Sequence, residues 1–356
     1  MTTTYPWPRR ATAAVSQPLV PRLYGGIPTL YGAPLAESPA DLRGADLACV
    51  GIPWSAPSPD SRPGVAAAAF AGTQLTPGIF RQNSLKYGGY LPELEVDVFE
   101  HLKLVDYGDV SVGNDVNVAL EEAYRVTAEV IDAGCIPLTI GGNSGVSSYP
   151  VLRAIADKAS GKVGVLNFDA HGDNGRTTPE ERVDRRHPRW AGTWALRILE
   201  ELPGVSARNY VHVGLRGPRN DPGVISRFLE VGVPRENIYT YRELKQARKR
   251  DVDELCHEAA ARALDGVDAL WIGIDTDVLT MGASPDYGDE PLGITSEELL
   301  EIVYQAGVQA GRARFGGFSI MALPPNALTL HWILMYAQLY ALAGLVHAAA
   351  GAGRQA

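Results

Sequence analysis

Five acidic and histidine side chains stand at short, regular spacing in two segments of the sequence. The segment FDAHGD carries Asp169, His171 and Asp173, and the segment GIDTDVL carries Asp275 and Asp277. If the chain is extended there, alternate residues point to the same side, so the side chains of each segment converge on one point. Converging carboxylates repel one another and lose hydration unless a cation neutralises them. Oxygen-rich ligands with one imidazole suit Mn²⁺, Ni²⁺ or Zn²⁺, so the two segments predict a metal site.

The alternative interpretation is that these residues are ordinary polar side chains in loops that follow strands. A single Asp-x-Asp pair would favour that alternative. The combination of Asp-x-His-x-Asp with Asp-x-Asp, each after an apolar run, favours ion binding or descent from an ion-binding ancestor.

Short β-branched runs and helical patterns alternate along the chain and must position these residues. The helical patterns include 116–134 and 295–311, the latter opening with Thr295 and Glu298 at capping-box spacing. Strands that are apolar on both faces and separated by helices predict a mostly parallel sheet covered on both sides. The predicted strands are 46–53, 102–110, 136–142, 162–170, 209–216, 237–241, 269–279 and 315–323.

The fold class predicted by this alternation is α/β. We expect residues 46–356 to form a single three-layer α/β/α domain whose mostly parallel sheet has about eight strands. Residues 1–45 are rich in Pro, Ala and Thr and predict an irregular N-terminal arm. Because ligands of such sheets collect at the carboxyl ends of the strands, the acid-and-histidine segments stand where a site is expected.

Composition excludes some classes of partner. The net charge of −9 and the pI near 5.3 argue against nucleic acid, which requires clustered Lys and Arg. The three cysteines lie far apart, in no metal or redox spacing, and such a low, odd count favours a reducing cytoplasm. The N-terminal residues lack an apolar stretch of signal-peptide length, so we expect no export signal and a cytoplasmic protein.

One long apolar segment, residues 328–351, resembles a membrane span by length. His331, Gln338 and His347 interrupt it, and no other segment has this character. We therefore expect a buried terminal helix or an oligomer-interface helix, and no membrane association.

Several motifs in fixed order resemble the ureohydrolase family, which includes arginase, agmatinase, guanidinobutyrase and guanidine hydrolase. They are RPG (62–64), TPGIFR (76–81), DYGDV (106–110), FDAHGD and GIDTDVL, and the resemblance runs from about residue 46 to about residue 345. It implies an α/β/α fold and hydrolysis of a guanidinium group to urea and an amine by hydroxide bridging two metal ions. The ions are usually Mn²⁺, and in some branches Ni²⁺.

The resemblance also assigns ligand positions. Asp169 and Asp275 match the bridging ligands, His171 and Asp277 match the remaining ligands of one ion, and Asp173 matches a ligand of the other.

The chain departs from the family pattern at chemically important positions. Ser144 in GGNSG stands where the family motif G-G-D-H-S has a metal-binding histidine. Ala322 stands where the motif M-E-V-N-P has a glutamate that pairs with the substrate guanidinium. Ala191 stands where the motif H-G-T has a proton-transferring histidine, and Thr280 replaces an aspartate. His187 could replace that histidine only if its loop were rebuilt.

These losses favour a degenerate subunit that supports an active paralogue of the same family. We therefore assign no catalytic residue to this chain and leave its substrate-binding residues unknown. The family resemblance implies trimers or hexamers, with Ni²⁺ or Mn²⁺ in the paralogue and partial or absent metal here. One precedent is the nickel-using heteromeric hydrolase of biguanides such as metformin, which pairs an active with an inactive chain. The substrate of the complex would then be a guanidino or biguanide compound, cleaved to urea or guanylurea plus an amine.

Two other hypotheses remain. The chain could be an active amidinohydrolase, similar to agmatinase or guanidine hydrolase, with one ion or a rebuilt site. Glu290 is then a candidate substrate anchor, although a solvated loop carboxylate is the preferred interpretation of that residue. The chain could also be a binding or regulatory protein that keeps the fold for assembly.

Overall fold

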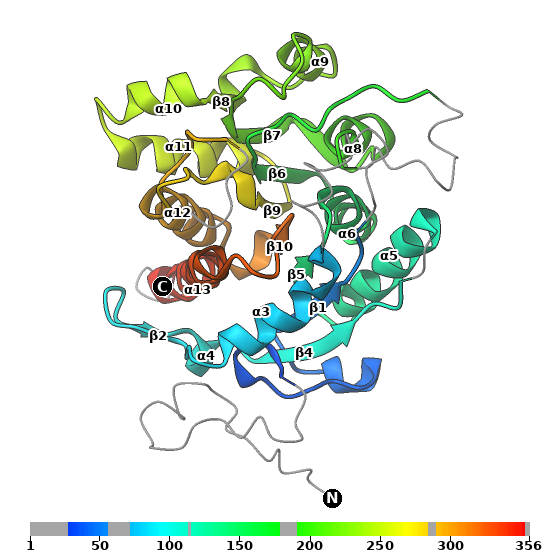
Figure 1. Cartoon of the computed structure of the whole chain (residues 1–356). Coiled ribbons are helices and arrows are strands. Elements are labelled where there is room, and N and C mark those ends of the chain that lie inside the picture. Colours follow the sequence, from blue (N-terminus) through cyan, green and yellow to red (C-terminus); the bar gives the residue numbers. More distant parts are fainter. Residues whose placement is uncertain (1–27, 56–71, 113–114, 179–190, 284–289, 353–356) are drawn as a thin grey trace, which may run out of the picture.

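The computed structural model describes residues 28–55, 72–112, 115–178, 191–283 and 290–352 of the 356-residue chain (Figure 1). The RPG segment, residues 62–64, and His187 lie outside the described residues, so the predictions made for them are untested.

The core of the protein is an eight-stranded sheet in which every pair of neighbouring strands is parallel. The strand order is β4-β1-β5-β10-β9-β6-β7-β8. All eight predicted strands are present, which confirms the α/β fold class. The strands are β1 (Leu47–Ile52), β4 (Leu104–Asp109), β5 (Ile136–Gly141), β6 (Val163–Phe168), β7 (Val205–Leu215), β8 (Ile238–Thr240), β9 (Ala269–Asp275) and β10 (Phe315–Met321).

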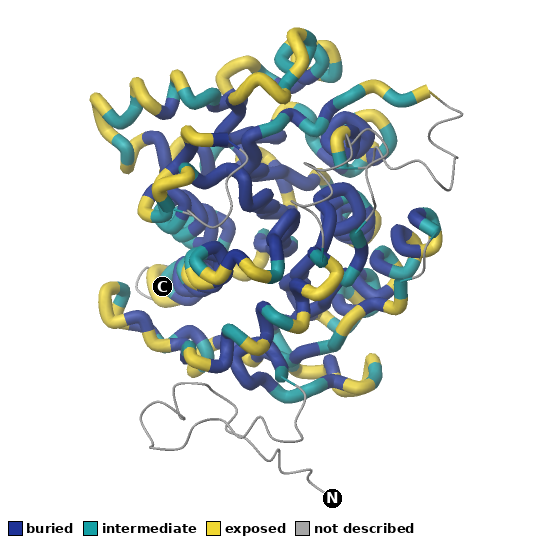
Figure 2. Tube along the Cα trace, viewed as in Figure 1, coloured by how far each residue is buried: buried dark blue, intermediate teal, exposed yellow. Residues whose placement is uncertain are grey.

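Successive side chains of a strand point to opposite faces of the sheet, so they are buried alternately in two hydrophobic clusters. In β1, Leu47 and Cys49 join one hydrophobic cluster, while Ala48, Val50 and Ile52 join the other. All six residues of this strand are buried, which explains its continuous apolar run. Figure 2 shows the buried central sheet between helices whose outer surfaces are exposed.

Helices cover both faces of the sheet, which gives the three layers (Figure 1). Helices α5, α6, α8 and α9 bury residues in one cluster, and α3, α10, α11, α12 and α13 bury residues in the other. The α-helices are α3 (Thr76–Ser84), α4 (Val98–His101), α5 (Val116–Asp132), α6 (Ser144–Lys158), α8 (Trp194–Glu201), α9 (Val224–Glu230), α10 (Tyr241–Ala247), α11 (Val252–Leu264), α12 (Ser296–Arg314) and α13 (Leu328–Ala352).

Short elements complete the fold. They are the 3-10 helices η1 (Leu30–Gly32), η2 (Pro39–Leu42), η3 (Thr73–Leu75), η5 (Arg235–Asn237) and η6 (Thr276–Val278), and the hairpin strands β2 (Tyr90–Leu91) and β3 (Val96–Asp97). Within the predicted arm, η1 is buried and η2 carries a capping box at Ser38 and Asp41.

Two of the family-like motifs meet in a buried ion pair. Arg81 of TPGIFR donates from Nε to Asp106 Oδ2 at 2.8 Å and from Nη2 to Asp106 Oδ1 at 3.0 Å. Both residues are at most 5% exposed, and Asp106 belongs to DYGDV. This bidentate contact fixes α3 against β4 at the edge of the sheet, so these two motifs stabilise the fold.

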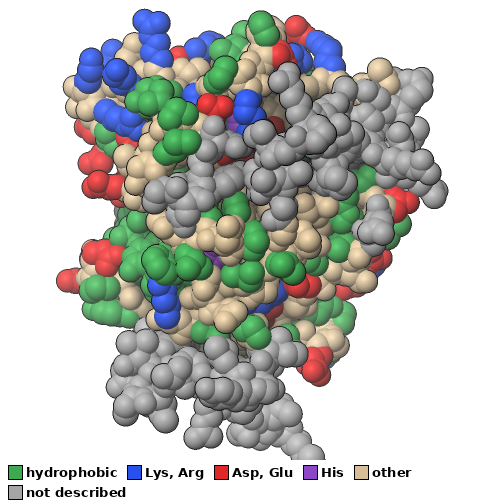
Figure 3. All heavy atoms as spheres, in the orientation of Figure 1, with side chains coloured by type: hydrophobic (Ala, Val, Ile, Leu, Met, Phe, Trp, Pro, Cys, Tyr) green, Lys and Arg blue, Asp and Glu red, His purple; other side chains and the backbone are tan. Residues whose placement is uncertain are grey.

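The apolar C-terminal segment is the helix α13, which packs against α12. Its length and composition would suffice to cross a membrane, but 61% of its most apolar window is buried inside the protein. This agrees with the predicted buried terminal helix. Three large side chains on it are partly exposed, Leu328, Trp332 and Tyr336, and Figure 3 shows hydrophobic side chains gathered over this helix.

Candidate metal centre

The acidic residues and the histidine converge at the carboxyl ends of two adjacent strands. Asp169 directly follows β6 and Asp275 is the last residue of β9, and these two strands pair in parallel from Val163 and Ala269 onward. Because parallel neighbours end at the same edge, the segments that were predicted to share a site do lie together.

The path between Asp169 and Asp173 is bent rather than extended. Asp173 has φ of +43°, in the left-handed region that few residues other than Gly, Asn and Asp adopt. Asn220 holds this bend, since its Oδ1 accepts from Gly172 N at 2.9 Å and its Nδ2 donates to Ala170 O at 3.0 Å. The predicted convergence is therefore correct, but a local turn produces it in place of strand alternation.

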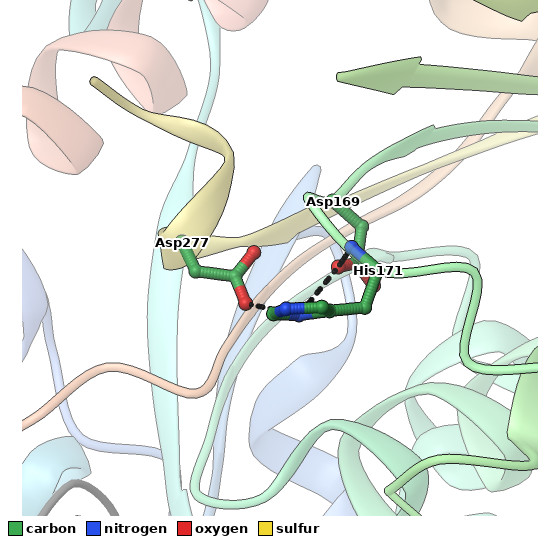
Figure 4. A group of neighbouring side chains, drawn as sticks. All are labelled: Asp169, His171 and Asp277. Atoms are coloured by element: carbon green, nitrogen blue, oxygen red, sulfur yellow. Dashed lines mark hydrogen bonds and ion pairs between the residues drawn. The ribbon is translucent and has the colours of Figure 1, made fainter. Parts of the chain in front are cut away.

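One group of possible ligands comprises Asp169, His171 and Asp277, whose ligand atoms all lie within 4.8 Å of one another (Figure 4). His171 Nδ1 is 2.8 Å from Asp277 Oδ2 and 3.8 Å from Asp169 Oδ1. Backbone N–H groups orient both carboxylates: His171 N donates to Asp169 Oδ1 and Ala170 N donates to Asp277 Oδ1. We call these three side chains the histidine group.

The histidine group has the chemistry that a divalent cation requires. Asp169 Oδ2 is buried and has no hydrogen-bond partner among the described residues. Burial, together with the charges of Asp173, Asp277 and Asp275, raises the pKa of Asp169 well above its usual value. Burial alone would also raise the pKa of Asp277, but the adjacent His171 imidazole lowers it to about 2. These carboxylates have lost hydration and repel one another. A cation bound here would neutralise their charges.

A second group comprises Asp169, Asp173 and Asp275, again within 4.8 Å. It contains no nitrogen donor, and we call it the carboxylate group. Neutral donors already contact one oxygen of Asp173: Trp194 Nε1 donates to Oδ2 at 3.0 Å and Ser144 Oγ lies 3.3 Å from the same atom. Burial raises the pKa of Asp173 to about 6, although these two donors lower it.

Trp194 is a site residue that the sequence interpretation missed. It opens α8, is fully buried, and packs edge-on against Trp271 with ring centroids 5.9 Å apart. This packing fixes the indole N–H so that it points at Asp173. The tryptophan at the end of WAGTW, three residues after Ala191, was the available signal.

The structure also locates the positions where the family pattern is broken. Ala322 follows β10 with φ of +54°, donates from N to Gly142 O at 2.7 Å and accepts from Thr276 Oγ1 at 2.7 Å. These backbone contacts tie the ends of β5, β9 and β10 together, while the methyl side chain offers no acceptor for a guanidinium. Ala191 contributes only its carbonyl oxygen, 3.4 Å from Ser144 Oγ.

The preferred interpretation of Glu290 as a solvated loop carboxylate is wrong. Glu290 is 5% exposed, and its Oε1 lies 3.5 Å from His171 Nε2. The expectation failed because an acidic residue near a Gly- and Pro-containing loop gives no sign of burial in the sequence.

A cavity of about 210 Å³ opens beside His171 and Asp173. Arg219, Asn220 and Arg227 also line it. Two residues of the candidate metal centre therefore line a small cavity, while Asp169, Asp275 and Asp277 are buried.

Comparison with known proteins finds relatives of this chain that are hydrolases. The sequence profile of the arginase family matches residues 45–328. The guanidinobutyrase of Pseudomonas aeruginosa is 28% identical over 344 residues, which cover 91% of this chain and 94% of that enzyme. The mitochondrial guanidino acid hydrolase of Mus musculus is 29% identical over 285 residues, covering 78% of this chain and 70% of that protein.

Solved structures share the fold. The formimidoylglutamase of Bacillus subtilis superposes with a TM-score of 0.73 at 23% identity, covering 94% of this chain and 98% of that one. The formiminoglutamase of Trypanosoma cruzi, solved with Mn²⁺, superposes with a TM-score of 0.71 at 22% identity, covering 90% and 98%.

Proposed function

This chain belongs to the arginase family, and we propose that it is a non-catalytic subunit that supports an active paralogue of the same family. The observation that carries this proposal is the state of Asp173. Its Oδ2 accepts from the indole N–H of Trp194 and lies 3.3 Å from the hydroxyl of Ser144, which stands where the family motif has a histidine. Within the described residues, only the histidine group combines an imidazole with carboxylates, so the carboxylate group is the weaker of the two possible ion sites.

The remaining chemistry supports the same proposal. A bound ion supplies a hydroxide at neutral pH, and a second ion helps to hold that nucleophile. The protein must also fix the substrate and move a proton with a positioned side chain. At the family positions for those tasks, this chain presents the methyl groups of Ala322 and Ala191.

The proposed complex hydrolyses a C–N bond of a linear amidine. Supporting this, the relatives include a guanidinobutyrase, guanidino acid hydrolases and an agmatinase. We propose a guanidino or biguanide substrate of the metformin type, cleaved to urea or guanylurea and an amine in the cytoplasm. The active paralogue would hold Ni²⁺ or Mn²⁺ and assemble with this chain as a trimer or hexamer. The partly exposed hydrophobic side chains of α13 are compatible with such an assembly.

A second candidate function is an active amidinohydrolase, similar to agmatinase or guanidine hydrolase, with a single ion. It is favoured by the histidine group, which retains an imidazole, two carboxylates and the unpartnered Asp169 Oδ2. One ion is sufficient to generate a hydroxide.

Purification of this chain alone, followed by metal analysis and urea assays, separates the two functions. The substrates are guanidine, agmatine, arginine, 4-guanidinobutyrate and a biguanide. The proposal expects at most one ion per chain and no turnover, and activity only after co-expression with a paralogue that retains the G-G-D-H-S and M-E-V-N-P motifs. Turnover by the metal-loaded chain alone would overturn it in favour of the one-ion enzyme.

A further inference from the structure

The imidazole of His171 lies between carboxylates on two sides. Its Nδ1 is 2.8 Å from Asp277 Oδ2 and faces the histidine group, while its Nε2 is 3.5 Å from Glu290 Oε1. Nε2 is buried and has no hydrogen-bond partner among the described residues. A shift of roughly half an ångström would bring Nε2 and Oε1 to ordinary hydrogen-bond distance.

The carboxylate of Glu290 is held in the protein interior by its surroundings. Gly217, with φ of +85°, lies so close that a Cβ at this position would collide with the carboxylate. The buried guanidinium of Arg216 donates to Gly214 O and Asp277 O, and Glu290 is one of the negative charges that act on it. Only 5% of the surface of Glu290 is exposed, so its carboxylate lies in the protein interior.

We propose that Glu290 is a positioning residue for ion binding: it holds His171 so that Nδ1 faces the space shared with Asp169 and Asp277. A neutral imidazole has one N–H and one lone pair, so a cation bound at Nδ1 leaves the N–H on Nε2. That N–H requires an acceptor, and the carboxylate beside it belongs to Glu290. Partners of this kind fix the tautomer and the ring orientation of a metal-binding histidine. The inference rests on the retained histidine group of the proposed function.

The test is a titration of the purified chain with Mn²⁺, in which the electron paramagnetic resonance signal of the free ion is followed. In Glu290→Ala the acceptor is lost, and the affinity for Mn²⁺ should fall about 10- to 100-fold. In Glu290→Gln an amide oxygen can still accept from Nε2, so the fall should be smaller. Glu297→Gln is the matched control, because it makes the same change at an exposed glutamate in the first turn of α12 and should leave the affinity unchanged.

A second readout separates positioning from a merely structural role. The visible absorption of the Co²⁺-loaded chain reports the geometry around the ion and should change in Glu290→Ala but not in Glu297→Gln. The proposal is overturned if Glu290→Ala binds Mn²⁺ within about twofold of the unsubstituted chain while only its thermal stability falls, since a lost hydrogen bond to a ligand costs more than that. It is also overturned if the unsubstituted chain binds no Mn²⁺, or if Glu290→Gln loses the ion as completely as Glu290→Ala, which would make Glu290 a direct ligand.

Failure of this inference can be distinguished from failure of the proposed function. Catalytic turnover by the chain alone would refute the non-catalytic role without affecting the Glu290 titration. Unchanged ion binding in Glu290→Ala would refute the positioning role while leaving the inactive subunit intact.

Discussion

The histidine group and the carboxylate group share Asp169, yet they differ in what surrounds their remaining members. In the histidine group, His171 and Asp277 face each other at 2.8 Å, and Asp169 Oδ2 has no hydrogen-bond partner within the described part of the chain. In the carboxylate group, the imidazole is absent and Asp173 is contacted by Trp194 and Ser144. The comparison shows that the donors next to Asp173 are neutral side chains, and such hydrogen bonds stabilise a buried carboxylate.

The largest expected difference between the groups is in their contribution to ion binding. Asp277→Asn keeps an oxygen for the N–H of Ala170 but places an amide opposite His171. We expect the affinity for Mn²⁺ to fall more than about 100-fold, beyond the range for loss of an outer hydrogen-bond partner. Asp173→Asn removes only a neighbouring charge and should cost about fivefold at most. Asparagine tolerates the left-handed backbone of residue 173, so this control should fold. Equal losses in the two variants, measured by Mn²⁺ titration, would contradict the distinction between the groups.

Restoring the carboxylate group is expected to add a second ion. Ser144→His supplies the missing imidazole and should raise metal occupancy, but Trp194 still donates to Asp173. Ser144→His combined with Trp194→Phe should therefore raise the stoichiometry from about one to about two Mn²⁺ per chain, because imidazole is a far better ligand than a hydroxyl. Neither variant should release urea from guanidino substrates, since Ala191 and Ala322 remain. Metal analysis after gel filtration measures the stoichiometry, and a ratio that stays at one would show that more than these two side chains excludes the ion.

The sequence predicted the strands and the acidic segments better than it predicted the contacts within the site. Continuous apolar runs separated by helical patterns were sufficient for the sheet, because parallel strands are buried on both faces. The pairing of β6 with β9 then brings Asp169 and Asp275 together. The donation from Trp194 to Asp173 depends instead on where α8 begins and on its packing against Trp271.

The surroundings of Glu290 and Asp173 were likewise not predictable from the sequence. Burial of Glu290 depends on the close approach of Gly217, seventy-three positions earlier in the chain, and no local pattern reports such an approach. The left-handed turn at Asp173 follows from the bonds that Asn220 makes to the neighbouring backbone. Spacing alone therefore predicted which residues lie together, but not the local geometry that brings them together.

The two tryptophans that pack against each other give a stability test of the carboxylate group. Trp194 donates to the carboxylate of Asp173, whereas Trp271 donates to the hydroxyl of Ser319 at 2.8 Å, and both are fully buried. Hydrogen bonds to charged groups contribute about 1.5–3 kcal/mol and those to neutral groups about 0.5–1.5 kcal/mol. In metal-free buffer at neutral pH, Trp194→Phe should therefore lower the free energy of unfolding by roughly 1 kcal/mol more than Trp271→Phe does, as measured by urea denaturation. A larger loss in Trp271→Phe would indicate that packing, and not the carboxylate, determines the cost.

The smallest expected effect is that of removing the Ser144 hydroxyl. Its contacts to Asp173 Oδ2 and Ala191 O are long, at 3.3 and 3.4 Å, so Ser144→Ala should cost no more than about 1 kcal/mol of stability. Alanine is also compatible with the first turn of α6, which Ser144 opens. The affinity for Mn²⁺ should stay the same, since the hydroxyl supports Asp173 and does not bind the ion. A fall in affinity would instead make Ser144 a ligand, and the carboxylate group would then be a second, weakened ion site. Because Ser144→Ala perturbs little else, it is the most direct test of the carboxylate group. It decides whether this group binds no ion or binds one more weakly than the histidine group does.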